Sequence, residues 1–400
     1  MTHGQHAGEA GLPSAPAVRR IVVAILLPLI FVTVAGMVVL WPGGEEPQIQ
    51  GAQRADATIL DIQECASLTT DADAEAACLE ATVRIDSGPD AGVEVVVPVP
   101  VGEGAPVFAA GDAVIVGAAE GKPIESRYEL IDLQRAWSLF ALVLTFAVAV
   151  IALSRWRGLR ALGSLALSVV ILIVFVLPAL LAGKPPLAVA VVGASAIMIG
   201  TLYLTHGFSA RTSVALLGTL ISLSLTGVLG LLFTSIGRFT GLAGESERFL
   251  ATVGDSIDLR GLLLAGLVIG ALGVLDDVTV TQTAAVWELA DADPAASRRA
   301  LFSAGLRIGR EHVSAAVNTL VLAYAGASLS LLMLFAVSGQ GVLDTVTTEL
   351  VAQEVVRALV GGLGIIAAVP VTTLIAALAV RERPRRSERI QPAHAAAAAP

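Results

Sequence analysis

The fold is decided by residues 262–289, LLLAGLVIGALGVLDDVTVTQTAAVWEL, in which an apolar segment of membrane type runs directly into two adjacent carboxylates. Asp276 and Asp277 follow only about fifteen uncharged residues after Gly261, and roughly 20 are needed to cross a bilayer at 1.5 Å per residue. The pair is therefore predicted to lie in the membrane or at its inner edge. Carboxylates at such a depth are costly, and they usually line a pathway or a binding cavity rather than face lipid.

The composition of the whole chain is that of an integral membrane protein. Of its 400 residues, 55% are hydrophobic and 15% are charged, whereas an ordinary soluble domain carries about 25% charged residues. The net charge of −9 is uneven, because acidic residues collect in 45–132 while arginines cluster near the chain ends and in short loops. This asymmetry indicates membrane topology rather than nucleic-acid binding. Two cysteines exclude a four-cysteine zinc site or iron–sulfur cluster, and no cofactor is expected.

Eight apolar segments are long enough to cross a bilayer, which predicts a polytopic α-helical membrane protein. The first, residues 19–41, begins with Arg19 and Arg20, is longer than a signal-peptide core and is predicted to be an uncleaved span. The other seven lie at 136–154, 160–182, 187–205, 213–233, 261–280, 313–337 and 356–380. The domains predicted around them are a disordered tail at 1–18, a β domain at 42–134, a seven-helix membrane domain at 135–380 and a basic, disordered tail at 381–400.

The placement of arginines predicts the orientation of these spans. Fifteen arginines fall on the side that the spans assign to the N-terminus. Apart from residues 42–134, a region too long to count in the charge rule, the opposite side carries only Lys184, Arg238, Arg248, Arg260 and Arg357. Because cytoplasmic loops carry an excess of positive charge, we expect a multi-pass cell-membrane protein with both termini in the cytoplasm and residues 42–134 outside.

Residues 42–134 alternate short runs rich in Val, Ile and Thr with Gly, Pro and Asp turns. Five strands are predicted, at ATILDI, ATVRI, VEVVVPV, DAVIVGA and RYELIDL. They would form a small sandwich or barrel, and an oligonucleotide-binding-type (OB-like) barrel is the nearest architecture, as an analogy of fold only. Nucleic acid is not an expected partner, because the strands carry more acid than base and almost no aromatic residues to stack on bases. Pro98 and Pro100 predict that the third strand lies at an edge.

Cys65 and Cys78 bracket an excursion between the first two strands. In a domain outside the cell they are predicted to form a disulfide, which for a loop of this length stabilises the fold by roughly 3 kcal/mol in the chain-entropy description. Two free thiols are the alternative.

Glycines recur within the spans, at Gly266, Gly270, Gly273, Gly361, Gly362 and Gly364. They predict close helix packing through small faces, which could also join copies of the chain into an oligomer. A phosphate-binding loop is not expected, because no strand precedes them.

Three predicted spans bring ionisable groups to the cytoplasmic side of the membrane. They end near His206, at Asp276–Asp277 and near Arg310–Glu311–His312. Further oxygen donors share the helix faces of these groups, and such ligands suit hard cations. The predicted ion or substrate site comprises Asp276, Asp277, Thr279, Gln282, Thr283, Glu311, His312, Asn318 and His206.

A structural role for these groups is the competing interpretation, since they could tie helix ends together near the lipid headgroups, where charges are cheap. Two carboxylates side by side are poorly suited to that role. Like charges repel, which favours a shared proton or a bound cation. Both interpretations stay open at this point.

Three motifs resemble signatures of the YibE/F-like membrane proteins: HGFSARTSVALLGTL (206–220), GVLDDVTVTQTAAVWEL (273–289) and GLRIGREHVSAAVNTLVLAYAGASL (305–329). The resemblance covers roughly residues 130–380. Glu311 stands where an aspartate is usual, and the Asp276–Asp277 doublet stands where one aspartate is usual, so that the equivalent aspartate is left open. The resemblance implies a bacterial multi-pass membrane protein of unassigned biochemical role.

Three functions compete on this basis. The first is a permease for a small solute or ion that uses the intramembrane carboxylates. The second is a non-transporting envelope accessory or scaffold protein that acts through its extracytoplasmic β domain. The third, a membrane-embedded metal hydrolase, is the weakest because the chain has no HExxH or Gly-x-Ser-x-Gly element. We therefore expect a protein without enzymatic activity whose partners are the lipid bilayer and a small cation or solute.

Overall fold

The computed structural model describes residues 16–43, 53–64, 78–102, 104–119, 121–253, 257–339 and 341–380. The chain divides into two compact units, which are described separately. The β unit comprises Gln48–Gly158, and the membrane unit comprises Met1–Pro47 with Leu159–Pro400. The predicted tails fall outside the described residues, except that residues 16–18 already belong to the first helix.

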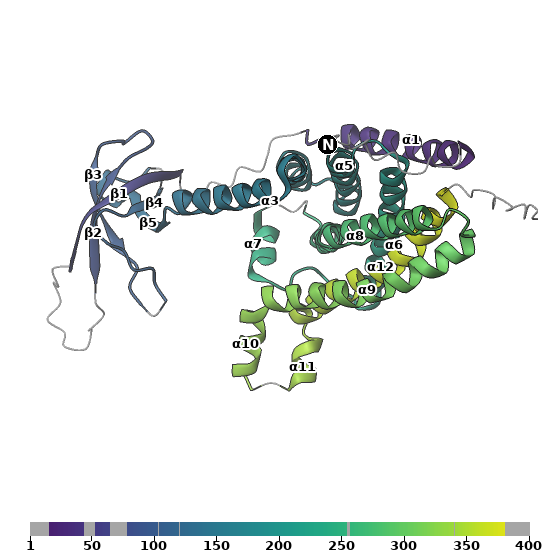
Figure 1. The fold of residues 1–400 in the computed structure, drawn as a ribbon. Coiled ribbons are helices and arrows are strands. Elements are labelled where there is room, and N and C mark those ends of the chain that lie inside the picture. The colour runs from purple at the N-terminus through teal and green to yellow at the C-terminus, as the bar shows by residue number, and fades with distance from the viewer. Residues whose placement is uncertain are drawn as a thin grey trace, which may run out of the picture. The chain divides into compact units, whose positions relative to one another are not determined.

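The β unit contains one five-stranded antiparallel sheet (Figure 1). Its strands are β1 (Gln53–Glu64), β2 (Leu79–Ile85), β3 (Glu94–Val99), β4 (Ala113–Ala118) and β5 (Tyr128–Leu133), and the short helix α2 (Ile124–Arg127) precedes the last. All five predicted strands are therefore present. Their order is β3-β2-β1-β4-β5, so that β3 with its Pro98 stands at one end, as its missing N–H donor predicts.

Alternation of buried and outward residues gives this sheet its core. In β3, Val95, Val97 and Val99 are buried, while the alternating Glu94, Val96 and Pro98 are exposed. A period of two places one set of side chains on each face of a strand. The buried faces of all five strands join in one hydrophobic cluster, so the unit has a core of its own.

A hydrogen-bonded carboxylate ties the loop before β3 to the start of β5. Asp90 Oδ2 accepts hydrogen bonds from the Tyr128 hydroxyl and from Arg127 Nη1, each at 2.7 Å. These two donors hold the pKa of Asp90 below its ordinary value, while burial raises the pKa of the Tyr128 hydroxyl. Nearby in the chain, Cys78 is disulfide-bonded. Cys65 lies outside the described residues, so the pairing of these two cysteines stays a prediction.

Among the residues that the structure describes, six helical segments are long and apolar enough to cross a membrane, or seven if one bent pair counts as a span. They are Arg20–Val39 of α1 (Pro16–Val39), the continuous segment Ala136–Leu181, α5 (Pro186–His206), α6 (Ala210–Ile236), α8 (Leu259–Ala292) and α12 (Glu349–Ala379). The bent pair is α9 (Arg298–Ala327) with α10 (Leu329–Val337), which meet at 61°.

The difference from the eight predicted spans arises in Ala136–Leu181. The predicted spans 136–154 and 160–182 form one 46-residue helical segment. It consists of α3 (Ala136–Ile171), the π-helical η1 (Leu172–Val176) and α4 (Leu177–Leu181). Within this segment Arg155 has φ 51° and ψ −125°, outside the helical region, so that two helices meet there at a kink. The predicted boundary is therefore a kink and not a loop.

Two further helices extend beyond their predicted limits. The span predicted at 261–280 is part of the 34-residue α8, in which Asp276 and Asp277 lie near the middle and not at the end. The span predicted at 313–337 is wrong as one straight helix, since α9 begins fifteen residues earlier and the chain bends at Ser328. The charged residues of both helices thus lie inside regular helix.

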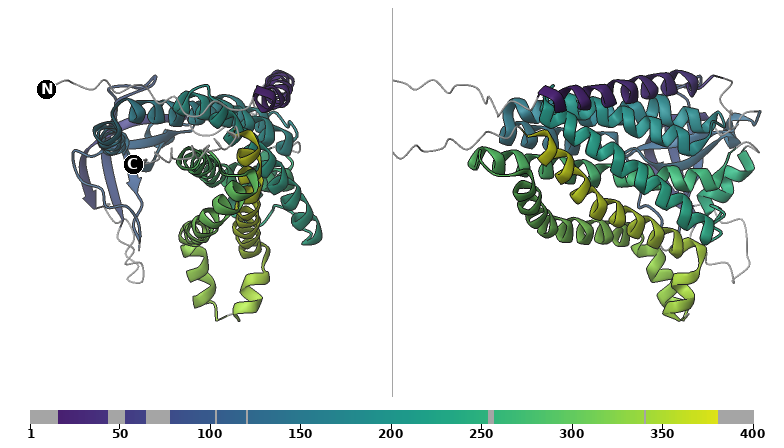
Figure 2. Two further views of the ribbon diagram at one scale, coloured as in Figure 1. Left: turned by 45° about the vertical axis from the view of Figure 1, so that its right-hand side comes forward. Right: turned by 90° about the vertical axis from the view of Figure 1, so that its right-hand side faces the viewer.

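The membrane unit packs around α12 and α8 (Figure 1). Helix α12 contacts α6, α8 and α9, while α8 also contacts α5 and α6. Helix α1 lies along the outside of these helices (Figure 2), against α5 and α6. The short helices α10 and α11 (Val342–Thr347) project away from the long ones, and α7 (Glu245–Val253) lies between α6 and α8 in the sequence.

Glycines allow these helices to approach closely. A Cβ at Gly361 would lie 3.1 Å from Leu320, and Gly270 and Gly364 face Tyr324 and Thr226. Nothing lies within 4 Å of a Cβ built at Gly266 or Gly273. Most of the predicted packing glycines therefore serve contacts within one chain, and an oligomer through these faces stays a prediction.

Gly309→Ala should destabilise the membrane unit by about 1–3 kcal/mol, because the new methyl group would overlap Val369 and approach Gln282 Oε1 to 2.7 Å. Gly273→Ala is the matched control, and it should be neutral or stabilising by up to about 1 kcal/mol because alanine favours the helix and meets no neighbour. Thermal unfolding of both variants in detergent provides the measurement. Equal effects of the two substitutions would contradict this packing.

Tyr128→Phe should lower the free energy of unfolding of the β unit by about 1 kcal/mol at neutral pH, because it removes one donor to Asp90 and keeps the ring. The folded-state pKa of Asp90 is depressed, so its stabilising contribution is present above the unfolded pKa and is lost as pH falls through the folded pKa. The difference between wild type and variant should therefore shrink in acid. Hydrogen exchange of β5 amides, corrected for intrinsic rates, measures it, and a difference independent of pH would be the contrary result.

Candidate functional site

The two adjacent aspartates of α8 have different surroundings. Successive helical residues point about 100° apart. Asp277 lies toward α9, where its Oδ2 is 3.9 Å from Nε2 of His312. Asp276 is partly buried, and its Oδ1 is buried without a hydrogen-bond partner. The doublet thus places one carboxylate beside a histidine and the other inside the helix packing.

The Asp277–His312 pair is open on one side. The side chain of Asp277 is 75% exposed and that of His312 is 37% exposed, although Nε2 of His312 is itself buried and makes no hydrogen bond. At 3.9 Å the two groups form an ion pair only when the histidine is protonated, and they are too far apart for a direct hydrogen bond. A proton, a water molecule or a cation could therefore be exchanged between this pair and its surroundings.

Thr279 and Thr283 are fully buried against other helices. The Thr279 hydroxyl lies 2.6 Å from that of Thr219 on α6, and Thr283 donates to the carbonyl oxygen of Thr279 at 2.7 Å. Thr279 also donates to the Asp276 carbonyl oxygen at 3.1 Å. These hydroxyls are thus engaged in helix packing directly beside Asp276.

Gln282 joins three helices. Its Nε2 donates at 2.7 Å to the Gly305 carbonyl oxygen on α9 and at 2.7 Å to Thr373 Oγ1 on α12. The side chain is buried, and Gly309 leaves room for it. In membranes such polar side chains hold helices together, so Gln282 fixes α8, which carries the aspartates, against α9 and α12.

The remaining predicted site residues lie apart from the aspartates. His206, Glu311 and Asn318 are all exposed. Within the described part of the chain, no hydrogen bond or ion pair joins them to Asp276 or Asp277. The residues that the structure brings together are therefore Asp276, Asp277 and His312, with Thr279, Gln282 and Thr283 packed behind them.

Two residues beside the site, Thr219 and Thr373, escaped the sequence reasoning. Both are fully buried threonines that contact predicted site residues from other helices. Thr219 lies within the 206–220 motif, which was a usable signal. Thr373 lies in an apolar stretch of α12 without any such signal.

The charged groups that the structure brings together are two carboxylates and one imidazole. Among the described residues, no group of three or more His, Cys, Asp or Glu side chains is arranged to hold a metal ion. A carboxylate beside an imidazole can instead pass a proton, because histidine titrates near neutral pH. Chains of Asp, Glu and His serve as proton relays inside membranes.

Comparison with known proteins places most of the membrane unit in one family. A family model described as YibE/F-like protein matches residues 142–382. This range contains Asp276, Asp277 and His312. No curated protein and no solved structure matches the chain.

Gln282→Leu should lower the stability of the membrane unit by about 1 kcal/mol, because two interhelical hydrogen bonds are lost from the packed interior. Thr281→Val is the matched control on the same helix, since Thr281 is exposed and donates only within α8. Thermal unfolding in detergent compares the two. A control that destabilises as much as Gln282→Leu would contradict the supporting role of Gln282.

Proposed function

Since the chain belongs to the YibE/F-like family, we propose that it is a permease for a small solute or ion that works through an intramembrane carboxylate–histidine site. Asp276 and Asp277 hold a proton or a monovalent cation, and His312 exchanges a proton with Asp277. The proposed role is not enzymatic. Its partners are the lipid bilayer and the transported species.

The observation that carries this proposal is the 3.9 Å approach of Asp277 to His312 from separate helices, next to a buried Asp276 oxygen without a partner. If these residues only tied helices together, every buried charged atom would have a hydrogen-bond partner, because an unpaired buried polar atom costs roughly 1–3 kcal/mol. Here one carboxylate oxygen and one imidazole nitrogen are buried and make no hydrogen bond. Such atoms suit a bound ligand that comes and goes.

The position of the site within the helix also supports the proposal. Asp276 is the eighteenth of 34 residues in α8. Ionisable residues within a spanning helix are costly, and they more often line an ion or substrate pathway than face lipid. The packed Thr279 and Gln282 hold α8 against α6, α9 and α12.

The proposed topology has eight spans and places both termini in the cytoplasm. The 46-residue segment Ala136–Leu181 would extend roughly 69 Å if straight, about twice the 30 Å of a hydrocarbon core. We therefore infer two crossings that meet at the kinked Arg155. The arginine bias then places the β unit outside the cell.

The proposed fold of the β unit is an OB-like barrel. Its strand order ends in β3 and β5, and these two strands contact each other. That contact supports closure of the sheet on itself.

A second candidate function is that of a non-transporting envelope accessory or scaffold protein. The β unit supports it, because this unit is compact and has its own hydrophobic core. A protein that acts only through this unit would not need the buried, unpaired Asp276 oxygen, and for that reason the permease is preferred.

Neutralising the aspartates tests whether they bind a ligand or only tie helices together. Wild-type protein in detergent should gain thermal stability on acidification or on addition of one monovalent cation, by about 2.7 kcal/mol at a hundredfold excess over Kd. Asp276→Asn and Asp277→Asn should stay folded and lose this gain, whereas Asp291→Asn, an exposed position on the same helix, should keep it. If neither pH nor cations change the thermal stability of the wild type, and both variants are only less stable than it, the aspartates do not form a binding site.

Labelling of single cysteines tests the orientation in a Cys65→Ser/Cys78→Ser background. Cysteines at Ala109 and Gly244 should react with an impermeant thiol reagent applied outside, and cysteines at Ser209 and Ser297 should be protected. The arginine distribution is the physical reason for this pattern. An inverted pattern would place the carboxylate–histidine site toward the opposite face.

A further inference from the structure

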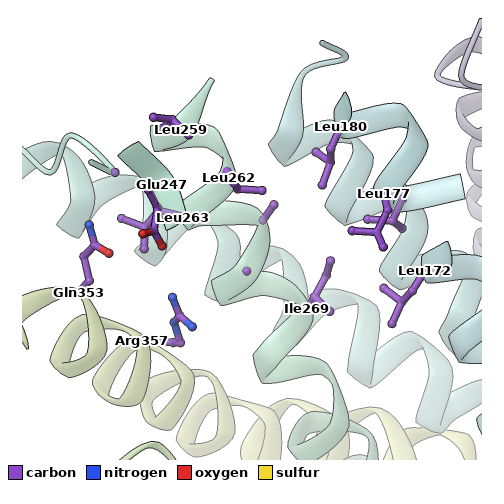
Figure 3. A pocket seen from close by; sticks show the side chains of 14 residues that line it. Leu172, Leu177, Leu180, Glu247, Leu259, Leu262, Leu263, Ile269, Gln353 and Arg357 are labelled. Carbon is purple, nitrogen blue, oxygen red and sulfur yellow. The ribbon is translucent and has the colours of Figure 1, made fainter. Parts of the chain in front are cut away.

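A cavity of about 350 Å³ lies in the membrane unit, along the first turns of α8 (Figure 3). Its walls come from η1 and α4, from α7, from α8 and from the start of α12. It is separate from the carboxylate–histidine site. Asp276 lies seven residues beyond Ile269, the last lining residue of α8, which is roughly 10 Å along the helix.

One end of this cavity is polar. Figure 3 shows Glu247 of α7 and Gln353 and Arg357 of α12 at that end. The cavity is thus lined there by one carboxylate, one amide and one guanidinium. A ligand that matches this set carries both a cationic and an anionic group.

Arg357 has unused hydrogen-bonding capacity at the polar end. Its Nη2 forms an ion pair with Glu354 at 3.5 Å, but its Nε is buried and has no hydrogen-bond partner. Its side chain is 27% exposed. A guanidinium offers five N–H donors in a planar fork that fits phosphate oxygens. An oxyanion in the cavity could therefore bind Arg357 while the pair with Glu354 persists.

The other end of the cavity is apolar. Figure 3 shows Leu172, Leu177, Leu180 and Ile269 there, well separated from the charged side chains. Leu177 is 53% exposed, so this end opens at the outer surface of a spanning segment, where lipid chains lie. A ligand can therefore enter from the bilayer with its chain still in the hydrocarbon.

We propose that this cavity binds a zwitterionic phospholipid with a primary amine in its headgroup. The phosphodiester oxygens bind the Arg357 guanidinium, the ammonium donates to Glu247 and Gln353 Oε1, and the first part of an acyl chain lies against Leu172, Leu177 and Ile269. An anionic lipid would leave Glu247 facing a negative charge. A quaternary ammonium headgroup has no N–H to donate to it.

The test uses the full-length protein in bilayer nanodiscs of phosphatidylethanolamine, phosphatidylcholine and phosphatidylglycerol in equal amounts. Mass spectrometry then identifies the lipids that stay bound after mild detergent extraction. Phosphatidylethanolamine should be retained about tenfold over phosphatidylcholine, because one charged hydrogen-bonded contact distinguishes the two. Equal retention of all three lipids, or preference for phosphatidylglycerol, would overturn the proposal.

Two charge variants test which part of the lipid headgroup Glu247 and Arg357 each bind. Glu247→Gln should abolish the preference for phosphatidylethanolamine over phosphatidylcholine, and Arg357→Gln should lower retention of every phospholipid. Glu245→Gln, an exposed position on the same short helix, should match wild type. Loss of the preference in this control, or its persistence in Glu247→Gln, would contradict the assignment.

A cavity-filling variant tests the proposal independently, in case the charge variants misfold. Nothing lies within 4 Å of a Cβ at Gly266, which lines the cavity and lies inside α8. Gly266→Leu should therefore fold normally, since leucine favours the helix, and should exclude the lipid. Undiminished lipid retention in this variant would overturn the proposal, whatever the outcome at the carboxylate–histidine site.

Discussion

Lipid offers no hydrogen bonds, so each polar side chain within the spanning helices must find its partner inside the protein or in a ligand. The membrane unit meets this constraint in most of its core. Thr279 pairs with Thr219, and Gln282 donates to Gly305 and Thr373. These bonds join α8 to α6, α9 and α12. The helices are thereby fixed around a few satisfied polar groups, with close contacts at small residues such as Gly309.

Five buried side-chain atoms of the described residues have no hydrogen-bond partner; two are the hydroxyl oxygens of Ser222 and Thr372, and three belong to ionisable side chains. The buried Asp276 oxygen, the buried His312 nitrogen and the buried Arg357 Nε have no hydrogen-bond partner in the described part of the chain. The Asp276 oxygen and the His312 nitrogen lie at the contact between α8 and α9, and the Arg357 Nε lies in the cavity near the start of α12. The proposed permease site lies at the first of these places and the proposed lipid site at the second, so either proposal can be wrong without the other.

The sequence contained enough to predict the family, the five strands and the apolar helices, but not how far the helices extend. Apolar runs predicted the end of α8 near residue 280, yet Asp276 and Asp277 do not break a helix, and α8 continues to Ala292. The starts of α8 and α9 carry capping residues that the prediction did not use: Asp258 accepts from Gly261 N, and Ser297 accepts from Ala300 N. The kink at Arg155 falls in the break predicted between residues 154 and 160, and Gly158 beside it allows a close approach, since a Cβ there would lie 2.5 Å from the Val150 carbonyl oxygen.

The candidate site was predictable as a set of residue types but not as a set of contacts. Helical spacing correctly grouped Asp276, Thr279 and Thr283 on one face, yet which of the two aspartates meets α9 depends on how that helix packs. His206 and Glu311 are also ionisable, but both are exposed, and in the described part of the chain neither forms a hydrogen bond or ion pair with Asp277. Sequence spacing within one helix carries no information on the rotation of its neighbour, and that rotation selects His312.

The central claim is that the Asp276–Asp277–His312 site moves charge across the membrane. It is tested most directly by recording currents from full-length protein in proteoliposomes adsorbed to a solid-supported membrane, with stepwise changes of pH, Na⁺ or K⁺ on one side. Wild-type protein should give a transient current for at least one of these steps, and the current should be lost in Asp277→Asn and altered in its pH dependence by His312→Gln. Wild-type protein that gives no current for any step, or a current unchanged by both substitutions, would contradict it.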